Sequence, residues 1–168
     1  FDSFTHLLET LAAADEQIDL FEFSLSKLVI RHLEPHFLKE RKKVAQVYSL
    51  KRLGHECSVL ISSLACRAGS DDETIKMAYD AGAAHLASAT ELNQLPPTEC
   101  GIQELDQALV ALVGVGPKLK RQLIEAAAAT VSADGYLQIQ EAELLRAISD
   151  SLDCPMPPLA IVLDTGAQ

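Results

Sequence analysis

The sequence predicts an all-α protein with about seven helices, on the basis of its composition and the spacing of its apolar residues. Of its 168 residues, 48% are hydrophobic, whereas only 5% are aromatic and none is tryptophan. Alanine and leucine, which favour helices over strands, recur along the chain and form runs such as residues 126–129. Apolar residues also return every three or four positions, as on one face of an amphipathic helix.

Four helices are expected in the first half of the domain, about residues 1–90. Apolar spacing places them at residues 4–14, 25–33 and 50–66 and from residue 71 to about residue 88. The first two form a hairpin, and the second ends before a proline, because the residue preceding proline is pushed out of the α region. Ser70 is expected to cap the fourth helix in a capping box with Glu73.

Residues 93–98 predict the connector between the halves, because two consecutive prolines cannot lie inside a helix. In the second half, about residues 98–158, three helices are expected near residues 102–113, 117–132 and 139–152. Residues 1–168 fit one domain, since a single core serves chains of up to roughly 200 residues. The chain begins at Phe1 without a leader, so we expect it to be excised from a larger protein.

The net charge and the cysteine content limit which partners and which cellular compartment we expect for the chain. The net charge of −10 disfavours nucleic acid or anionic lipid as a partner of the surface as a whole. The four cysteines have neither CxxC spacing nor the density of a disulfide scaffold, so we interpret them as reduced thiols of a cytosolic protein. No apolar run approaches the roughly 20 residues of a transmembrane helix, and the fragment is expected to be soluble.

One basic segment, residues 39–52, departs from this acidic balance. It holds six of the 14 lysines and arginines, namely Lys39, Arg41, Lys42, Lys43, Lys51 and Arg52. One interpretation is a solvated loop between helices. The other is a surface for an anionic partner or membrane, since clustered basic residues bind anionic headgroups.

An internal repeat relates the two ends of the chain. Placing Ala14 on Ala133 aligns Asp15 with Asp134, and the register continues through the following helices. Each copy consists of a helix, a turn carrying Ala-Asp, two apolar residues two positions apart, and a glutamate in the first turn of the next helix. Two such helix-turn-helix units predict a duplication with pseudo-two-fold packing.

The acidic residues of this repeat have two interpretations. They can act locally, because Asp19 can cap the second helix with Glu22 three residues later, and a carboxylate in a first turn suits the helix dipole. However, the spacing from Asp15 to Glu22 recurs between Asp134 and Glu141. The second interpretation is therefore one paired acidic site that collects a divalent cation or a basic partner segment. The sequence leaves open whether a metal binds.

The repeat resembles the TerB-like domains, helical modules named for the tellurite-resistance protein TerB, whose mark is Ala-Asp-Gly, a hydrophobic pair and Glu at a helix turn. Residues 133–141 match this mark, and residues 14–22 match it with Glu16 in place of glycine. Residues 143–158 and 18–33 also resemble the carboxyl end of bacterial HtpX-like membrane zinc metallopeptidases that carry a TerB-like extension. The likeness is strong at both ends of the chain and weak in the middle.

The resemblance implies a non-catalytic, C-terminal accessory domain that regulates such a peptidase or recruits its partners and substrates. Its partners would be the upstream peptidase domain and other proteins, at the cytoplasmic face of the bacterial inner membrane. The catalytic zinc is expected in the upstream domain, and the fragment itself is expected to need no cofactor. In agreement, none of the five histidines lies in an HExxH or HxxEH motif.

Two further motifs lead to weaker predictions. Residues 134–141 match the second half of an EF-hand loop, but Thr130 and Ser132 replace its first carboxylates, so no tight calcium site is expected. The turn around Gly114 and Gly116 resembles a helix-hairpin-helix, whose amides and lysine hold a DNA phosphate. The alternative function is thus a nucleic-acid-binding module that uses this turn and the basic segment. Glycine then proline at a helix junction also explains the turn structurally.

Overall fold

The computed structural model describes residues 47–137, 139–154 and 156. Within them the chain forms five α-helices and two short 3-10 helices, and the one extended pairing is a single bridge. The elements are η1 (Leu50–Arg52), α3 (Gly54–Ala68), α4 (Asp72–Leu86), η2 (Pro97–Glu99), α5 (Ile102–Leu112), α6 (Pro117–Val131) and α7 (Ile139–Ser151). The all-α prediction is confirmed for this part. The count of five differs from about seven, and the helices predicted at residues 4–14 and 25–33 lie outside the described residues.

The helix predicted at residues 50–66 is divided in the structure. Leu50–Arg52 forms a separate 3-10 turn, and Leu53 ends it by donating its amide to the Leu50 carbonyl at 2.8 Å. The backbone of Leu53 (φ −116°, ψ 24°) is not helical, so α3 begins at Gly54. The other predicted helices begin and end within a few residues of the observed bounds, because their apolar spacing and their flanking prolines and glycines are local signals.

The predicted cap of α4 is wrong by one residue. Asp71, not Ser70, is the N-cap, and its Oδ1 accepts a hydrogen bond from the Thr74 amide at 2.9 Å. Asp71 has the extended backbone of a cap and lies three residues before that amide, which is the separation a capping side chain spans. The same hydrogen bond lowers the pKa of the Asp71 carboxyl below its ordinary value of 3.8.

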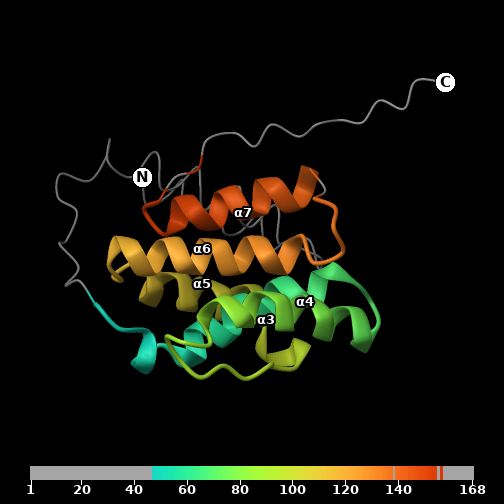
Figure 1. Cartoon of the computed structure of the whole chain (residues 1–168), viewed down its shortest axis with the longest axis horizontal. Helices are drawn as coiled ribbons and strands as arrows, with labels where there is room; N and C mark the ends of the chain where they lie inside the picture. The colour runs from blue at the N-terminus through green and yellow to red at the C-terminus, as the bar shows by residue number, and fades with distance from the viewer. Residues whose placement is uncertain (1–46, 138, 155, 157–168) are drawn as a thin grey trace, which may run out of the picture.

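The helices share one hydrophobic core, with α6 between α7 and the pair α3 and α4 (Figure 1). Leu60, Leu86, Leu112 and Leu123, from four different helices, are each 0% exposed. Burying a leucine side chain stabilises a fold by about 1.5–3 kcal/mol, so these contacts hold the helices together. None of the described helices has both the length and the apolar character that crossing a bilayer requires.

A buried glycine lets α4 and α6 approach closely. A Cβ atom on Gly82 would lie 2.9 Å from the carbonyl oxygen of Ala126 and in closer contact with Oγ1 of Thr130. The Thr130 hydroxyl donates to the same carbonyl at 3.0 Å, so it is fixed in place. The sequence of α4 therefore needs its smallest residue where α6 crosses it.

Residues 93–98, where the sequence predicts a connector, lie between α4 and α5, and the 3-10 helix η2 begins inside them. The connector is held against α3 by two buried serines. The hydroxyl oxygens of Ser58 and Ser62 accept hydrogen bonds from the amides of Asn93 and Leu95, each at 3.0 Å. Because both serines lie on one face of α3, the connector follows that helix closely and brings the chain from α4 to α5.

Candidate functional site

The turn between α6 and α7 carries the C-terminal copy of the acidic repeat. The Tyr136 amide donates to Oδ1 of Asp134 at 2.9 Å, and the Gly135 amide donates to the Ser132 carbonyl at 3.0 Å. Gly135 has φ +84°, a conformation that glycine adopts without strain. Nothing lies within 4 Å of the position of a Cβ at Gly135, so its conformation alone requires the glycine.

The two acids of this copy lie at different places in the turn and the helix that follows it. Asp134 orders the turn through its carboxylate, and Glu141 lies in the first turn of α7, where negative charge suits the helix dipole. Asp15, Asp19 and Glu22 lie outside the described residues, so a joint acidic site remains a prediction. Among the described residues, no three histidine, cysteine, aspartate or glutamate side chains gather as ligands for a metal ion.

Of the basic segment, only the C-terminal end lies among the described residues. Lys51 and Arg52 are exposed on η1, which begins two residues after Tyr48. The other four residues of the predicted basic surface lie outside the described residues: Lys39, Arg41, Lys42 and Lys43.

The glycine-rich turn between α5 and α6 is bound to the chain that precedes η1. Val47 and Val115 form a parallel bridge, in which the Val47 amide donates to the Gly114 carbonyl at 2.8 Å and the Gly116 amide donates to the Val47 carbonyl at 2.9 Å. The Gly116 amide, which a helix-hairpin-helix would offer to a phosphate, is therefore engaged within the protein. The bridge also brings together two features of the sequence, the basic segment and the glycine-rich turn.

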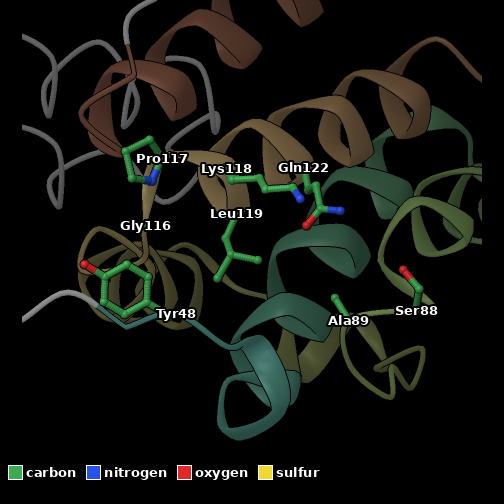
Figure 2. Close-up of a pocket in the computed structure, with 8 residues that line it drawn as sticks. All are labelled: Tyr48, Ser88, Ala89, Gly116, Pro117, Lys118, Leu119 and Gln122. Atoms are coloured by element: carbon green, nitrogen blue, oxygen red, sulfur yellow. The ribbon is translucent and has the colours of Figure 1, made fainter.

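A pocket of about 420 Å³ opens beside this bridge, at the N-terminal end of α6, and we call it the α6 pocket (Figure 2). Tyr48 forms one side, and Ser88 and Ala89, which follow α4, form the other. Leu119 lies between them, as Figure 2 shows. The volume of the pocket lies within the range of roughly 300–1,000 Å³ that is typical of small-ligand sites.

Polar atoms of the α6 pocket come mainly from α6 itself. Lys118 and Gln122, one helical turn apart, extend over the pocket on the same side of the helix (Figure 2). Gly116 caps α6 and Pro117 is its first residue, so the positive end of the helix dipole faces this region. No acidic residue lies in the first turn of α6, in contrast to the first turns of α3, α4, α5 and α7.

Lys118, which lines the α6 pocket, and Lys51 and Arg52 on η1 differ from several other described cations. Within the described residues, the side chains of Lys51, Arg52 and Lys118 form no ion pair. Lys120, by contrast, lies 3.9 Å from Asp153, and its side chain is only 12% exposed. The other described ion pairs are Lys76–Asp80, Arg121–Glu125 and Arg146–Glu143. Lys118 therefore gives the pocket a positive charge on its α6 side, in a chain of net charge −10.

The lining of the α6 pocket and the state of the cysteines offer little for covalent catalysis. Among its described lining residues there is no carboxylate, histidine or cysteine that could act as a base for Ser88. Elsewhere, burial raises the pKa of Cys57 to about 12 and that of Cys100 to about 11. Both thiols are protonated at neutral pH, whereas the thiolate is the nucleophile.

The pocket could not be found from the sequence, because its walls come from segments far apart in the chain. The helix-hairpin-helix-like motif includes Gly116 and the lysine that follows it, Lys118, but no motif of the sequence includes Tyr48, Ser88 or Gln122. A partial signal was present, since an aromatic residue stands between the basic residues of the segment and the apolar Leu50.

Comparison with models of protein families, with curated proteins and with solved structures gives no match. What the described residues define is a class, namely an all-α fold with an open pocket that a lysine lines at one helix end.

Proposed function

We propose that the chain is a non-catalytic, TerB-like accessory domain of a bacterial membrane zinc metallopeptidase, which recruits partners or substrates to that enzyme. The observation that carries a binding role is the α6 pocket, whose lining includes the cationic side chain of Lys118. Concave sites with a few polar groups over an apolar base are the usual places for ligands.

The link to a peptidase comes from the sequence motif, and the geometry of its C-terminal copy agrees with the motif's pattern. Asp134 and Gly135 form a tight turn, and Glu141 follows in the next helix. Tyr136 and Ile139, at 77% and 57% exposure, are open to solvent there. This turn therefore offers a second surface to protein partners, such as the upstream peptidase domain.

The proposed location is the cytoplasmic face of the inner membrane. The basic segment would face the anionic leaflet, where each basic residue near the surface contributes about 1 kcal/mol. Lys51 and Arg52 are exposed at the end of the domain that holds the α6 pocket, so the pocket would lie close to the membrane surface and to the tethered enzyme.

The reading frame of the gene provides the first test, because an HExxH motif and membrane spans should precede Phe1. The full-length protein in membrane vesicles is then compared with a version that lacks residues 1–168. We expect the deletion to slow cleavage of casein, a protein substrate, and to leave cleavage of a short peptide unchanged. An upstream sequence without a zinc motif, or equal casein cleavage by the two proteins, would refute the proposal.

The isolated chain gives a separate readout. We expect no cleavage of casein and no loss of helicity on adding a chelator, because the described residues hold no grouping of zinc ligands and the histidine motifs are missing from the sequence. Proteolysis by the purified, zinc-loaded chain would show that it is itself a peptidase and not an accessory domain.

A further inference from the structure

We propose that the α6 pocket binds the free carboxyl terminus of a polypeptide that ends in apolar residues. The terminal carboxylate lies beside Lys118 and Gln122, and the last apolar side chain lies over Leu119 and Ala89 (Figure 2). This inference rests on the proposed function, because it names the part of a partner or substrate that the accessory domain would recognise.

Charge is the first argument. Lys118 carries a positive charge that no described carboxylate neutralises, although acids outnumber bases by 24 to 14 in the chain. A charge-assisted hydrogen bond from an ammonium group to a carboxylate is about twice as strong as a neutral one. The positive end of α6 adds to the same potential. A ligand with one negative charge therefore complements this side of the pocket.

The side of the pocket that lies away from Lys118 indicates where the carboxylate of the ligand is bound. Ser88 and Ala89, on that side of the pocket, offer no positive charge to an anion. Lys118 and Gln122 stand on the other side, which assigns the carboxylate to them.

Shape and polarity favour a chain end over other anions. The base of the pocket is apolar, with Leu119 half-buried against the core and the Tyr48 ring beside it, so part of the ligand must be apolar. Ser88, Pro117 and Lys118 are exposed at its mouth, which lets the rest of a polypeptide leave into solvent. A terminal residue supplies a carboxylate and an apolar side chain on neighbouring atoms, as the lining requires.

Nucleic acid fits these features less well. A duplex presents a row of phosphates, whereas the pocket is a single concave site on an acidic protein that repels polyanions at long range. The Gly116 amide, the phosphate donor that the turn would supply, already donates to the Val47 carbonyl at 2.9 Å. We therefore argue for the carboxylate and use duplex DNA as a competing outcome.

The test is fluorescence anisotropy with the full 168-residue chain and a labelled peptide ending in Ala-Leu-Leu with a free carboxyl group. The same peptide with a carboxamide end is the matched probe, since it differs only in its charge. We expect the amide to bind at least about fivefold more weakly, as loss of a charge-assisted contact predicts. Equal binding of the two peptides, or binding of neither, would overturn the inference.

Two variants on α6 localise the contact. Lys118→Gln should weaken binding of the free-carboxyl peptide about fivefold to tenfold. Arg121→Gln is the control, because it also removes one positive charge from an exposed position on α6 but does not line the pocket. Circular dichroism should show equal helicity for both. Equal weakening of peptide binding by the two variants would show that long-range charge alone causes the effect, and would overturn the assignment of the carboxylate to the pocket.

Competitors distinguish the sources of the anion. Octanoate, a free carboxylic acid, should displace the peptide only weakly, since it lacks the peptide backbone that continues beyond the pocket. Displacement by octanoate at the peptide's own concentration would assign the pocket to a free acid. Stronger displacement by duplex DNA or by phosphatidylglycerol vesicles, abolished by Lys118→Gln, would assign it to phosphate. Either result overturns the chain-end inference.

The two proposals fail separately. If deletion of residues 1–168 slows casein cleavage by the parent but Lys118→Gln does not, and the two peptides bind equally, the accessory function stands and the carboxylate site is wrong. If the free-carboxyl peptide binds through Lys118 and the deletion changes nothing, the site stands and the peptidase role is wrong.

Discussion

Replacing Gly82 by alanine tests how the fold brings α4 and α6 together. In an open helix this change would stabilise the protein by about 1 kcal/mol, the difference in helix propensity. Here the new Cβ would lie 2.9 Å from the carbonyl oxygen of Ala126, which belongs to the backbone, and 3.2 Å from Cγ2 of Ile61, and it would contact Oγ1 of Thr130 more closely still. The helices must therefore move apart, and overpacking of this kind costs about 1–3 kcal/mol.

The net expectation for Gly82→Ala is a loss of up to about 2 kcal/mol, which lowers the melting temperature by up to about 8 °C in a chain of this length. Urea and thermal unfolding followed by circular dichroism measure both quantities. Ala84→Gly, at an exposed position of the same helix, isolates the propensity term and should cost about 1 kcal/mol. Thr130→Ala should be less costly in the Gly82→Ala background than alone, because it removes the clashing hydroxyl. An increase in stability for Gly82→Ala would refute the close approach of the two helices.

Three further predictions concern single features of the described chain. Asp71→Ala should lower the melting temperature by a few degrees, because it removes the cap of α4. The pKa of Asp71 is lowered in the folded state, so the stability that the native residue adds should be present above pH 3.8 and be lost as the pH falls below that value. Asp71→Asn, which also caps, should show no such pH dependence. Gly135→Ala should cost about 1–2 kcal/mol through its positive φ, and Gly135→Asn less, as unfolding in urea would show. Co-sedimentation with phosphatidylglycerol vesicles at low salt should be stronger for the native chain than for a variant with four basic residues changed to glutamine. Equal binding of the two would support the interpretation of the basic segment as a solvated loop. These four are Lys42, Lys43, Lys51 and Arg52.

The helices of the described part were predictable because their signals are local. Prolines and glycines at residues 96–97, 114–117 and 135 limit the helices on either side, and the apolar spacing fills the space between them. The error in the predicted cap of α4 is equally local. Ser70 and Asp71 are both good caps, and only the position of the Thr74 amide decides between them.

The candidate site could not be predicted in the same way, because it depends on contacts between distant residues. The bridge from Val47 to Val115 spans most of the described chain, and no local pattern marks either residue as its partner. In the sequence, Lys118 belongs to the helix-hairpin-helix-like turn and Lys51 to a separate basic segment. The fold places Lys118 on the lining of the α6 pocket and Lys51 on η1, three residues after Tyr48, which also lines that pocket.

The glycine at the start of α6 shows why the motif and the site are distinct. Gly116 has φ −64° and ψ 156°, a backbone conformation that any residue adopts, so no turn geometry requires glycine there. A Cβ would lie 3.4 Å and 3.6 Å from Cδ1 and Cε1 of Tyr48, and the carbonyl of Val47 lies nearby at 3.9 Å. These are ordinary van der Waals distances, so an alanine would fit against the Tyr48 ring without moving it. Neither the backbone conformation nor the packing requires glycine at this position, and the amide that a DNA-binding turn would offer to phosphate donates to the Val47 carbonyl instead.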